Sequence, residues 1–559
     1  MQPPARIRAS ASWICCMAAL LVPLPALAVS SISVDIGEMH GAAGSARNVS
    51  LDYQLNGKLQ LRGEIKPANH QQTAGADGQP WVKTSLDCSA FSIQPPVRVH
   101  CNDGQFSSGK INVPFTLALD LPQDNQPLDL TLQLKAASFS DAAGLHAGEK
   151  VSGNINLHAT QNLQGWQWHT VVDWQGGEVF WQPFYFASGG HKLMASGQLD
   201  KQWLTVEDAS LELKNVGVAR FSGKLRLPNR SIQAVNLDAP TLDLTTLYPL
   251  ILKPLLEKTA FNNLEVAGQA GLSFAMHDGE FDAFQLDLHD ADMEDKNGSF
   301  ALYKINASLP WSYDEARVLK LAYAGGRLLK LPLGQTALTA NVDRYSLTAA
   351  SLKLPVLDGA VALSDVSAGW VNDQWHWHLR ANLLPISMTE FSHALSWPTM
   401  QGQLSATIPL VTYSDGQLTT DGTLLFNVFN GTATIAGLNM QNPLGQAPVL
   451  SANVRFRNLD LGALTRTFSF GAIEGKLDGD VNNLQLVDWQ PVQFDAALYS
   501  SPGDYKKKIS QRAVENISAL GGAGATAAIQ RSFLRFFDEF NYKMIGLSCR
   551  LRSGQCLLG

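Results

Sequence analysis

Cysteine is the residue type whose spacing in this chain most directly suggests chemistry. Beyond the two cysteines in the apolar N-terminal stretch, four remain in two local pairs, Cys88 with Cys101 and Cys549 with Cys556. An even number of cysteines in an exported chain is typical of disulfides, so we predict one disulfide in each pair. A zinc site made from all four is the alternative, but neither pair has the short spacing that zinc sites favour.

Other residues with possible chemistry are isolated. His376 and His378 would share one face of a strand, where two metal ligands can lie, but no third ligand is evident and an exposed strand face is the simpler interpretation. The glycines of residues 521–524 are not followed by the Gly-Lys-Ser/Thr of a phosphate loop, and residues 292–298 lack calcium-loop spacing. No Gly-x-Ser-x-Gly motif is present. We therefore predict a protein that is not an enzyme and has no cofactor or metal.

Charge excludes one class of partner and leaves another open. The net charge of −7 gives no support for nucleic-acid binding. A basic cluster near the C-terminus is placed to contact anionic lipid headgroups, and a solvated helix face is the alternative. The cluster consists of Lys506, Lys507, Lys508, Arg512, Arg531 and Arg535.

Strict alternation of apolar and polar residues dominates the elements between these sites. Alternation places the apolar side chains on one face of a strand and the polar ones on the other. Hydrophobic residues at 45% and charged residues at 16% exclude general disorder. The residues that we predict to line the apolar face are Leu59, Leu61, Leu130, Leu132, Leu211, Leu213, Phe284, Leu286, Leu288, Leu484 and Leu486.

Short apolar segments interrupt the strands and suggest a repeat. Three such segments lead to Gly268, Gly402 and Gly475, and the last two glycines lie about 70 residues apart. The distance from Gly268 to Gly402 is about twice that, so the copy between them is degenerate. We expect each glycine to mark a strand bend or bulge.

A one-sided sheet of this length favours an open architecture. Barrels and sandwiches bury an apolar face, but they usually stop near the size of one domain. We predict an all-β fold with short helices, in which repeats form an extended, curved, taco-like β-groove over residues 29–500. Residues 1–28 have the basic start, apolar core and Ala26-Leu-Ala28 site of a signal peptide, with an uncleaved N-terminal anchor as the alternative.

The last part of the chain, residues 501–559, has a different pattern. Helical spacing of apolar residues predicts one helix over residues 506–520 and a second over residues 527–540. A strand follows, and a turn at Ser553 and Gly554 makes a hairpin that Cys549 and Cys556 can clamp. The prediction is a two-helix element followed by a disulfide hairpin.

Eight residues of this C-terminal part form a recognisable signature: Gln511, Arg512, Gly521, Phe533, Phe536, Gly546, Cys549 and Cys556. The signature resembles that of YdbH-like proteins, which are similar to AsmA-like envelope proteins and are in some cases labelled "dicarboxylate transport" domains. The resemblance implies a groove-shaped periplasmic bridge that carries phospholipid between the inner and outer membranes of a Gram-negative envelope. It also implies a small outer-membrane lipoprotein that adds strands at the C-terminal edge.

The hypothesis at this stage is a passive periplasmic lipid conduit, with acyl chains along the apolar face and headgroups at its open edge. One alternative is a secreted structural or adhesive β-solenoid whose apolar face is a sealed core. A second is a small-molecule (dicarboxylate) uptake component, which would need a basic pocket that the sequence does not locate.

Overall fold

The computed structural model describes residues 30–41, 44–67, 81–94, 98–122, 127–259, 261–443, 447–467, 471–520 and 538–559. Most of these residues form antiparallel strands, which confirms the predicted all-β class with short helices. Contacts between residues divide the chain into two compact units, Met1–Ala118 and Leu119–Gly559. None of the helices in the described part of the chain has the length and hydropathy needed to cross a membrane.

In the first unit, consecutive strands pair antiparallel from β1 to β5. Register places Val34, Leu51, Leu61 and Leu86 side by side in one apolar row, because alternation directs all of them to the same face. The predicted disulfide between Cys88 and Cys101 joins β4 to β5, with the two Cα atoms 5.7 Å apart. The strands are β1 (Ser31–Gly41), β2 (Gly44–Gln54), β3 (Leu59–Pro67), β4 (Val82–Gln94), β5 (Arg98–Ser108) and β6 (Ile111–Asp120), the last of which crosses the unit boundary.

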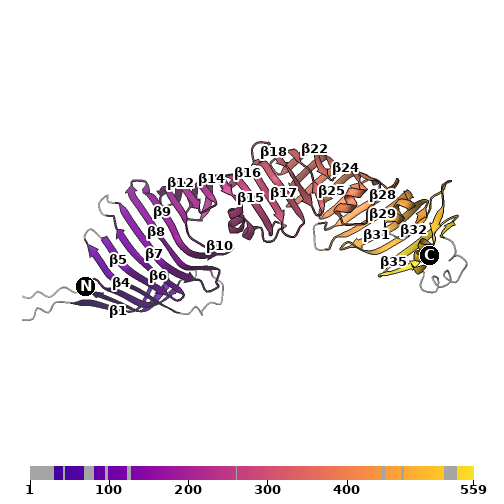
Figure 1. Ribbon diagram of the computed structural model, residues 1–559. Helices are drawn as coiled ribbons and strands as arrows, with labels where there is room; N and C mark the ends of the chain where they lie inside the picture. The colour runs from indigo at the N-terminus through magenta and orange to yellow at the C-terminus, as the bar shows by residue number, and fades with distance from the viewer. Residues whose placement is uncertain are drawn as a thin grey trace, which may run out of the picture. The chain divides into compact units, whose positions relative to one another are not determined.

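The second unit is built on one long antiparallel meander, in which strands follow one another along the sheet from β7 to β36 (Figure 1). Its strands are β7 (Leu128–Ser140), β8 (His146–Asn162), β9 (Gly165–Trp181), β10 (Phe184–Phe186), β11 (His191–Leu199), β12 (Trp203–Leu213), β13 (Gly217–Arg226), β14 (Ser231–Asp243), β15 (Leu264–His277), β16 (Glu280–Asp295), β17 (Phe300–Ser312), β18 (Arg317–Tyr323), β19 (Gly325–Leu328), β20 (Leu331–Leu333), β21 (Thr336–Asp343), β22 (Ser346–Val356), β23 (Gly359–Val371), β24 (Gln374–Ser387), β25 (Gln403–Ser414), β26 (Gln417–Asp421), β27 (Thr423–Val428), β28 (Gly431–Gln441), β29 (Val449–Asp460), β31 (Lys476–Val487), β32 (Gln490–Ser500), β35 (Gly546–Arg552) and β36 (Gln555–Leu558). Three short strands, β30 (Ile473–Glu474), β33 (Lys508–Ser510) and β34 (Glu539–Asn541), form a separate small sheet.

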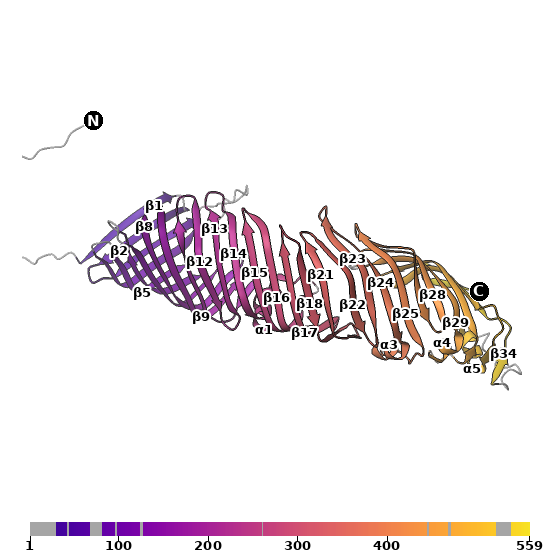
Figure 2. The same ribbon diagram turned by 90° about the horizontal axis from the view of Figure 1, so that it is seen from above.

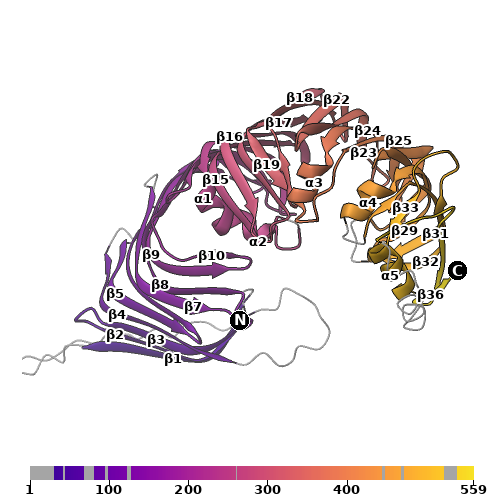
Figure 3. The same cartoon turned by 45° about the vertical axis from the view of Figure 1, so that its right-hand side comes forward.

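Short helices lie along one long edge of this sheet. Helices α1, α3 and α4 follow β14, β24 and β29, and all three lie at the same edge, which we call the helix edge (Figure 2). At the opposite edge, tight turns join the strands, and we call it the hairpin edge. Within this unit the sheet is curved and the helices lie on its concave side (Figure 3). The helices are α1 (Leu244–Leu247), η1 (Tyr248–Leu252), α2 (Lys253–Leu255), α3 (Met388–Ala394), α4 (Leu461–Thr467) and α5 (Gln511–Leu520).

The predicted repeat appears in the structure as a recurring helix-to-strand connection. The backbone N–H of Met388, at the start of α3, donates to the carbonyl of Gly402 at 2.9 Å. Leu461, at the start of α4, makes the same bond to Gly475 at 3.0 Å. These glycines have φ of 99° and 151°, and Gly268 in the first copy has 97°, a region that favours glycine. The register of β15 shifts at Gly268, as expected for a bulge.

A buried hydroxyl completes each connection. Ser392 Oγ accepts from the backbone N–H of Met400 at 3.1 Å, and Thr465 Oγ1 accepts from that of Ile473 at 3.2 Å. The Tyr248 hydroxyl accepts in the same way from the start of β15 at 2.8 Å. The hydroxyl satisfies a buried backbone donor that the sheet leaves unpaired. In the degenerate copy a hairpin between β19 and β20 takes the place of the helix.

Two predicted helical boundaries are wrong. Residues 508–510 form strand β33, so α5 begins at Gln511 and not at residue 506. Ile509 is buried in the small sheet, where it pairs with Ile473, and this pairing outweighs the local helical spacing. Phe540, predicted at the end of the second helix, lies in β34. The rest of that helix, residues 527–537, lies outside the described residues.

Candidate functional site

Apolar side chains form long cross-strand rows on the concave face of the second unit. Residues in register on neighbouring antiparallel strands lie about 5 Å apart, so each row is a mainly apolar track across the strands, interrupted by Thr170 in one row and Gly479 in the other. One row, from β7 to β17, consists of Leu130, Leu157, Thr170, Ala195, Ala209, Phe221, Leu237, Phe274, Phe284 and Trp311. Another, from β22 to β35, consists of Leu354, Val361, Leu383, Ala406, Phe426, Ala433, Phe456, Gly479, Leu498 and Leu547.

The eleven predicted groove residues all lie on the apolar face of their own unit, and all are half-buried. Leu59 and Leu61 are on β3 in the first unit. In the second unit, one group lies on β7, β12 and β16, and a second group lies on β31. These are Leu130, Leu132, Leu211, Leu213, Phe284, Leu286, Leu288, Leu484 and Leu486. Helix α1 packs against the same face, because Leu244 and Leu247 contact the cluster that holds Leu286 and Leu288.

Partial exposure is the property that separates this face from an ordinary core. Among the described residues, apolar side chains such as Ile305 and Ile386 are deeply buried, at 2% exposure, whereas row residues such as Phe284 and Phe426 are half-buried. A sealed β core would bury side chains of that kind completely. The large side chains of the rows are therefore only partly buried within the described chain.

Charged groups gather on the opposite face. Asp480 lies between Arg455 and Arg457, whose nitrogens are 3.3 and 2.9 Å from its carboxylate, and it also accepts from the Tyr499 hydroxyl. Burial raises the pKa of Asp480, but hydrogen bonds from Arg457 and Tyr499 outweigh it and keep that pKa below its usual value. The convex face is therefore charged and solvated, in contrast to the rows.

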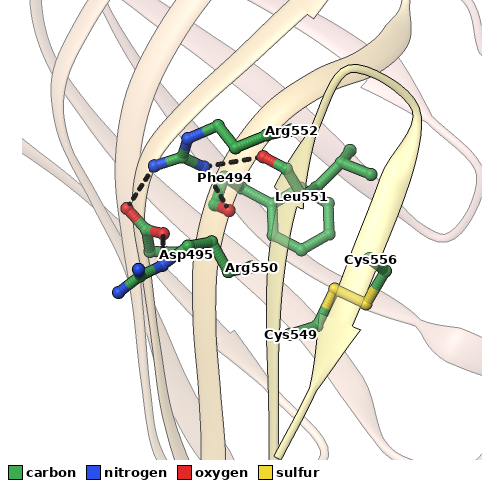
Figure 4. Close-up of a disulfide and its surroundings, with 7 residues drawn as sticks. All are labelled: Phe494, Asp495, Cys549, Arg550, Leu551, Arg552 and Cys556. Carbon is green, nitrogen blue, oxygen red and sulfur yellow. Dashed lines mark hydrogen bonds and ion pairs between the residues drawn. A yellow bond between two sulfur atoms is a disulfide. The ribbon is translucent and has the colours of Figure 1, made fainter.

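The C-terminal hairpin continues the main sheet. Strand β35 pairs with β32, and Asp495 on β32 accepts from Arg550 at 3.1 Å and from Arg552 at 2.8 Å (Figure 4). The disulfide predicted between Cys549 and Cys556 joins β35 to β36, with Cα atoms 5.6 Å apart. The hairpin is thus held both covalently and by ion pairs.

The remaining predicted positions are placed as follows. Gln511 and Arg512 lie at the start of α5, and Gly546 begins β35. Gly521, Phe533 and Phe536 lie outside the described residues. His376 and His378 share the convex face of β24, where they pair with Gly369 and Ser367. Within the described residues, no group of three or more His, Cys, Asp or Glu side chains could hold a metal ion.

Alternation alone misses part of the apolar face, because bulges change which residues point inward. In β16, Leu286 and Leu288 point inward, and beyond Asp290, which has a φ of 45°, Ala291 and Met293 point inward instead. An aspartate or asparagine at the point where alternation shifts is the sequence signal of such a bulge, since these residues tolerate positive φ.

Comparison of the chain with protein-family models, with curated proteins and with solved structures found no match.

Proposed function

We propose that this protein is a periplasmic bridge that binds phospholipid acyl chains on the concave apolar face and lets them move along its rows between the inner and outer membranes. The observation that carries the proposal is the combination of mainly apolar rows with incomplete burial of their large side chains. An exposed apolar surface of this extent marks a binding surface in a stable soluble domain.

The energetics of acyl chains favour such a route. Moving a chain of about 16 carbons into water costs on the order of 12 kcal/mol, at about 0.8 kcal/mol per CH₂ group. Moving the same chain from a bilayer to the rows exchanges one apolar environment for another, so the cost is small. The protein would supply a path that avoids water and needs no chemical step.

A solenoid with a sealed core is the competing function, and burial argues against it. Fully buried apolar residues such as Ile305 and Ile386 lie near the helix edge, where helices cover the sheet. Row residues farther from that edge, such as Phe284 and Phe426, are only half-buried.

The C-terminal edge is where we propose that a partner binds. Among the described strands, β36 pairs only with β35, and its Leu557 and Leu558 are exposed. An unpaired edge with apolar side chains is suited to strand addition by another chain, and a small outer-membrane lipoprotein is the partner we propose.

Native mass spectrometry of the full chain, purified from the envelope in mild detergent, tests the proposal. We expect phospholipids to remain bound and to be released by delipidation without loss of the fold. A monodisperse, correctly folded protein that carries no lipid when purified and takes up none from vesicles would contradict it.

A further inference from the structure

Between β16 and β24, the two long edges of the sheet differ in how far they expose the apolar face. On β16, exposure rises from 2% at Ala291, near the helix edge, to 41% at Phe281, beside the hairpin edge. On β24 it rises from 2% at Ile386 to 52% at Trp375 in the same direction. The helices cover one side of the concave face, and the opposite side is open.

Aromatic residues gather along the open side. Phe281 and Trp311 have ring centroids 4.8 Å apart, Trp311 and Tyr345 are 6.3 Å apart, and Trp370 and Trp375 are 5.4 Å apart. The carbonyl of Tyr345 accepts from the backbone N–H of Trp370 at 2.9 Å, which joins the two groups. These five residues extend from β16 to β24 beside the turns of the hairpin edge, and we call them the aromatic rim.

The rim contacts the polar turns through Trp311. The indole N–H of Trp311 donates to the carbonyl of Arg344, in the turn between β21 and β22. The Arg344 guanidinium lies 5.0 Å from the centre of the Tyr313 ring and donates to the Tyr313 carbonyl at 3.0 Å. From the helix edge outward, the surface thus changes from leucine and alanine to amphipathic rings and then to polar turns.

Tryptophan and tyrosine prefer the boundary between an apolar phase and water, because one part of each ring is apolar and another part forms hydrogen bonds. The accessible part of β16, from Phe281 to Leu288, spans roughly 23 Å at about 3.3 Å per residue. The hydrocarbon of one bilayer leaflet is about 15 Å thick, so acyl chains fit within this depth.

We infer that lipids bind with one orientation: the glycerol and headgroup lie at the aromatic rim, and the chain ends point toward the helix edge. This inference rests on the proposed function and adds to it the side on which headgroups travel. An amphiphile is the ligand whose own polarity gradient matches that of the surface.

Two photoreactive phosphatidylcholines test the orientation on the full wild-type chain, one with a diazirine in the headgroup and one with a diazirine at the acyl terminus. After irradiation, mass spectrometry of peptides locates the labelled residues. We expect the headgroup probe to label the rim several-fold more than Leu286 and Leu288, and the acyl-terminus probe to show the opposite preference.

The outcomes separate the two proposals. If both probes label the aromatic rim and the pair Leu286 and Leu288 equally, or with the reverse preference, the orientation is wrong and lipid binding stands. If neither probe labels the concave face, the proposed function fails and the orientation fails with it.

Discussion

Replacement of Phe426 by aspartate should block lipid movement, whereas the same replacement of Leu425 should not. The two residues are neighbours on β27 and point to opposite faces: Phe426 lies in an apolar row between Ala406 and Ala433, and Leu425 pairs with threonines on the convex face. Both are bulky and apolar, and Leu425 is 37% exposed, so the pair differs mainly in the face it occupies.

The magnitude follows from the cost of a charge within hydrocarbon. A carboxylate at the centre of an apolar phase costs about 2.5 to 3.5 kcal/mol on insertion scales. At 1.36 kcal/mol per factor of ten, a barrier of that size slows passage roughly 70- to 400-fold if every lipid must pass the site. Without lipid, the half-buried position leaves the new carboxylate hydrated, so we expect the fold to persist.

The assay is transfer of a fluorescent phospholipid from donor to acceptor vesicles by the purified protein. Thermal unfolding of both variants verifies that each is folded. Equal transfer by the Phe426→Asp and Leu425→Asp variants, both folded, would refute the assignment of the concave face as the lipid path.

Three further predictions concern stability. Gly268→Ala should lower the unfolding temperature more than Gly176→Ala, because a Cβ at Gly268 would lie 2.6 Å from the backbone of β16 at a φ of 97°, whereas nothing lies within 4 Å at Gly176; equal shifts would contradict this. Thr465→Val should cost about 1 to 3 kcal/mol, because the N–H of Ile473 loses its acceptor, and Thr465→Ser should retain most of the stability in denaturant unfolding. Hydrogen bonds from Arg552 and then Asn483 lower the pKa of Asp495. The contribution of Asp495 to the stability of the folded state is therefore complete above the ordinary aspartate pKa of about 3.9, and it is lost as the pH falls through the lowered pKa. Hydrogen exchange should show acid-dependent loss of protection in β35 that Asp495→Asn abolishes, and an unchanged pH dependence in that variant would contradict the role of the ion pairs.

Much of the fold could be predicted because alternation is a local property of the chain. Each of the selected leucines, such as Leu132 and Leu211, is on the apolar face for this reason. The glycines of the repeat could also be recognised in the sequence, because the positive φ at those positions favours glycine.

The features that escaped prediction depend on distant partners. Ile509 has helical spacing but forms a strand, because residues far away in the sequence supply its neighbours. The aromatic rim combines residues from several hairpins, such as Phe281 and Trp311, whose proximity follows only from strand register and bulges. The role of the Ser392 hydroxyl, which accepts a hydrogen bond from the backbone N–H of Met400, is evident only from the folded structure.

Photo-crosslinking in cells at two adjacent positions of β16 tests the central claim most directly. A benzophenone amino acid at Phe284, which points to the concave face, should become attached to phospholipid, and the same group at Gln285, on the convex face, should not. Phospholipid adducts at Phe284 alone are the result that the lipid-conduit account predicts. Crosslinks from Phe284 only to other segments of the same chain would show that the apolar rows are packed shut and would contradict it.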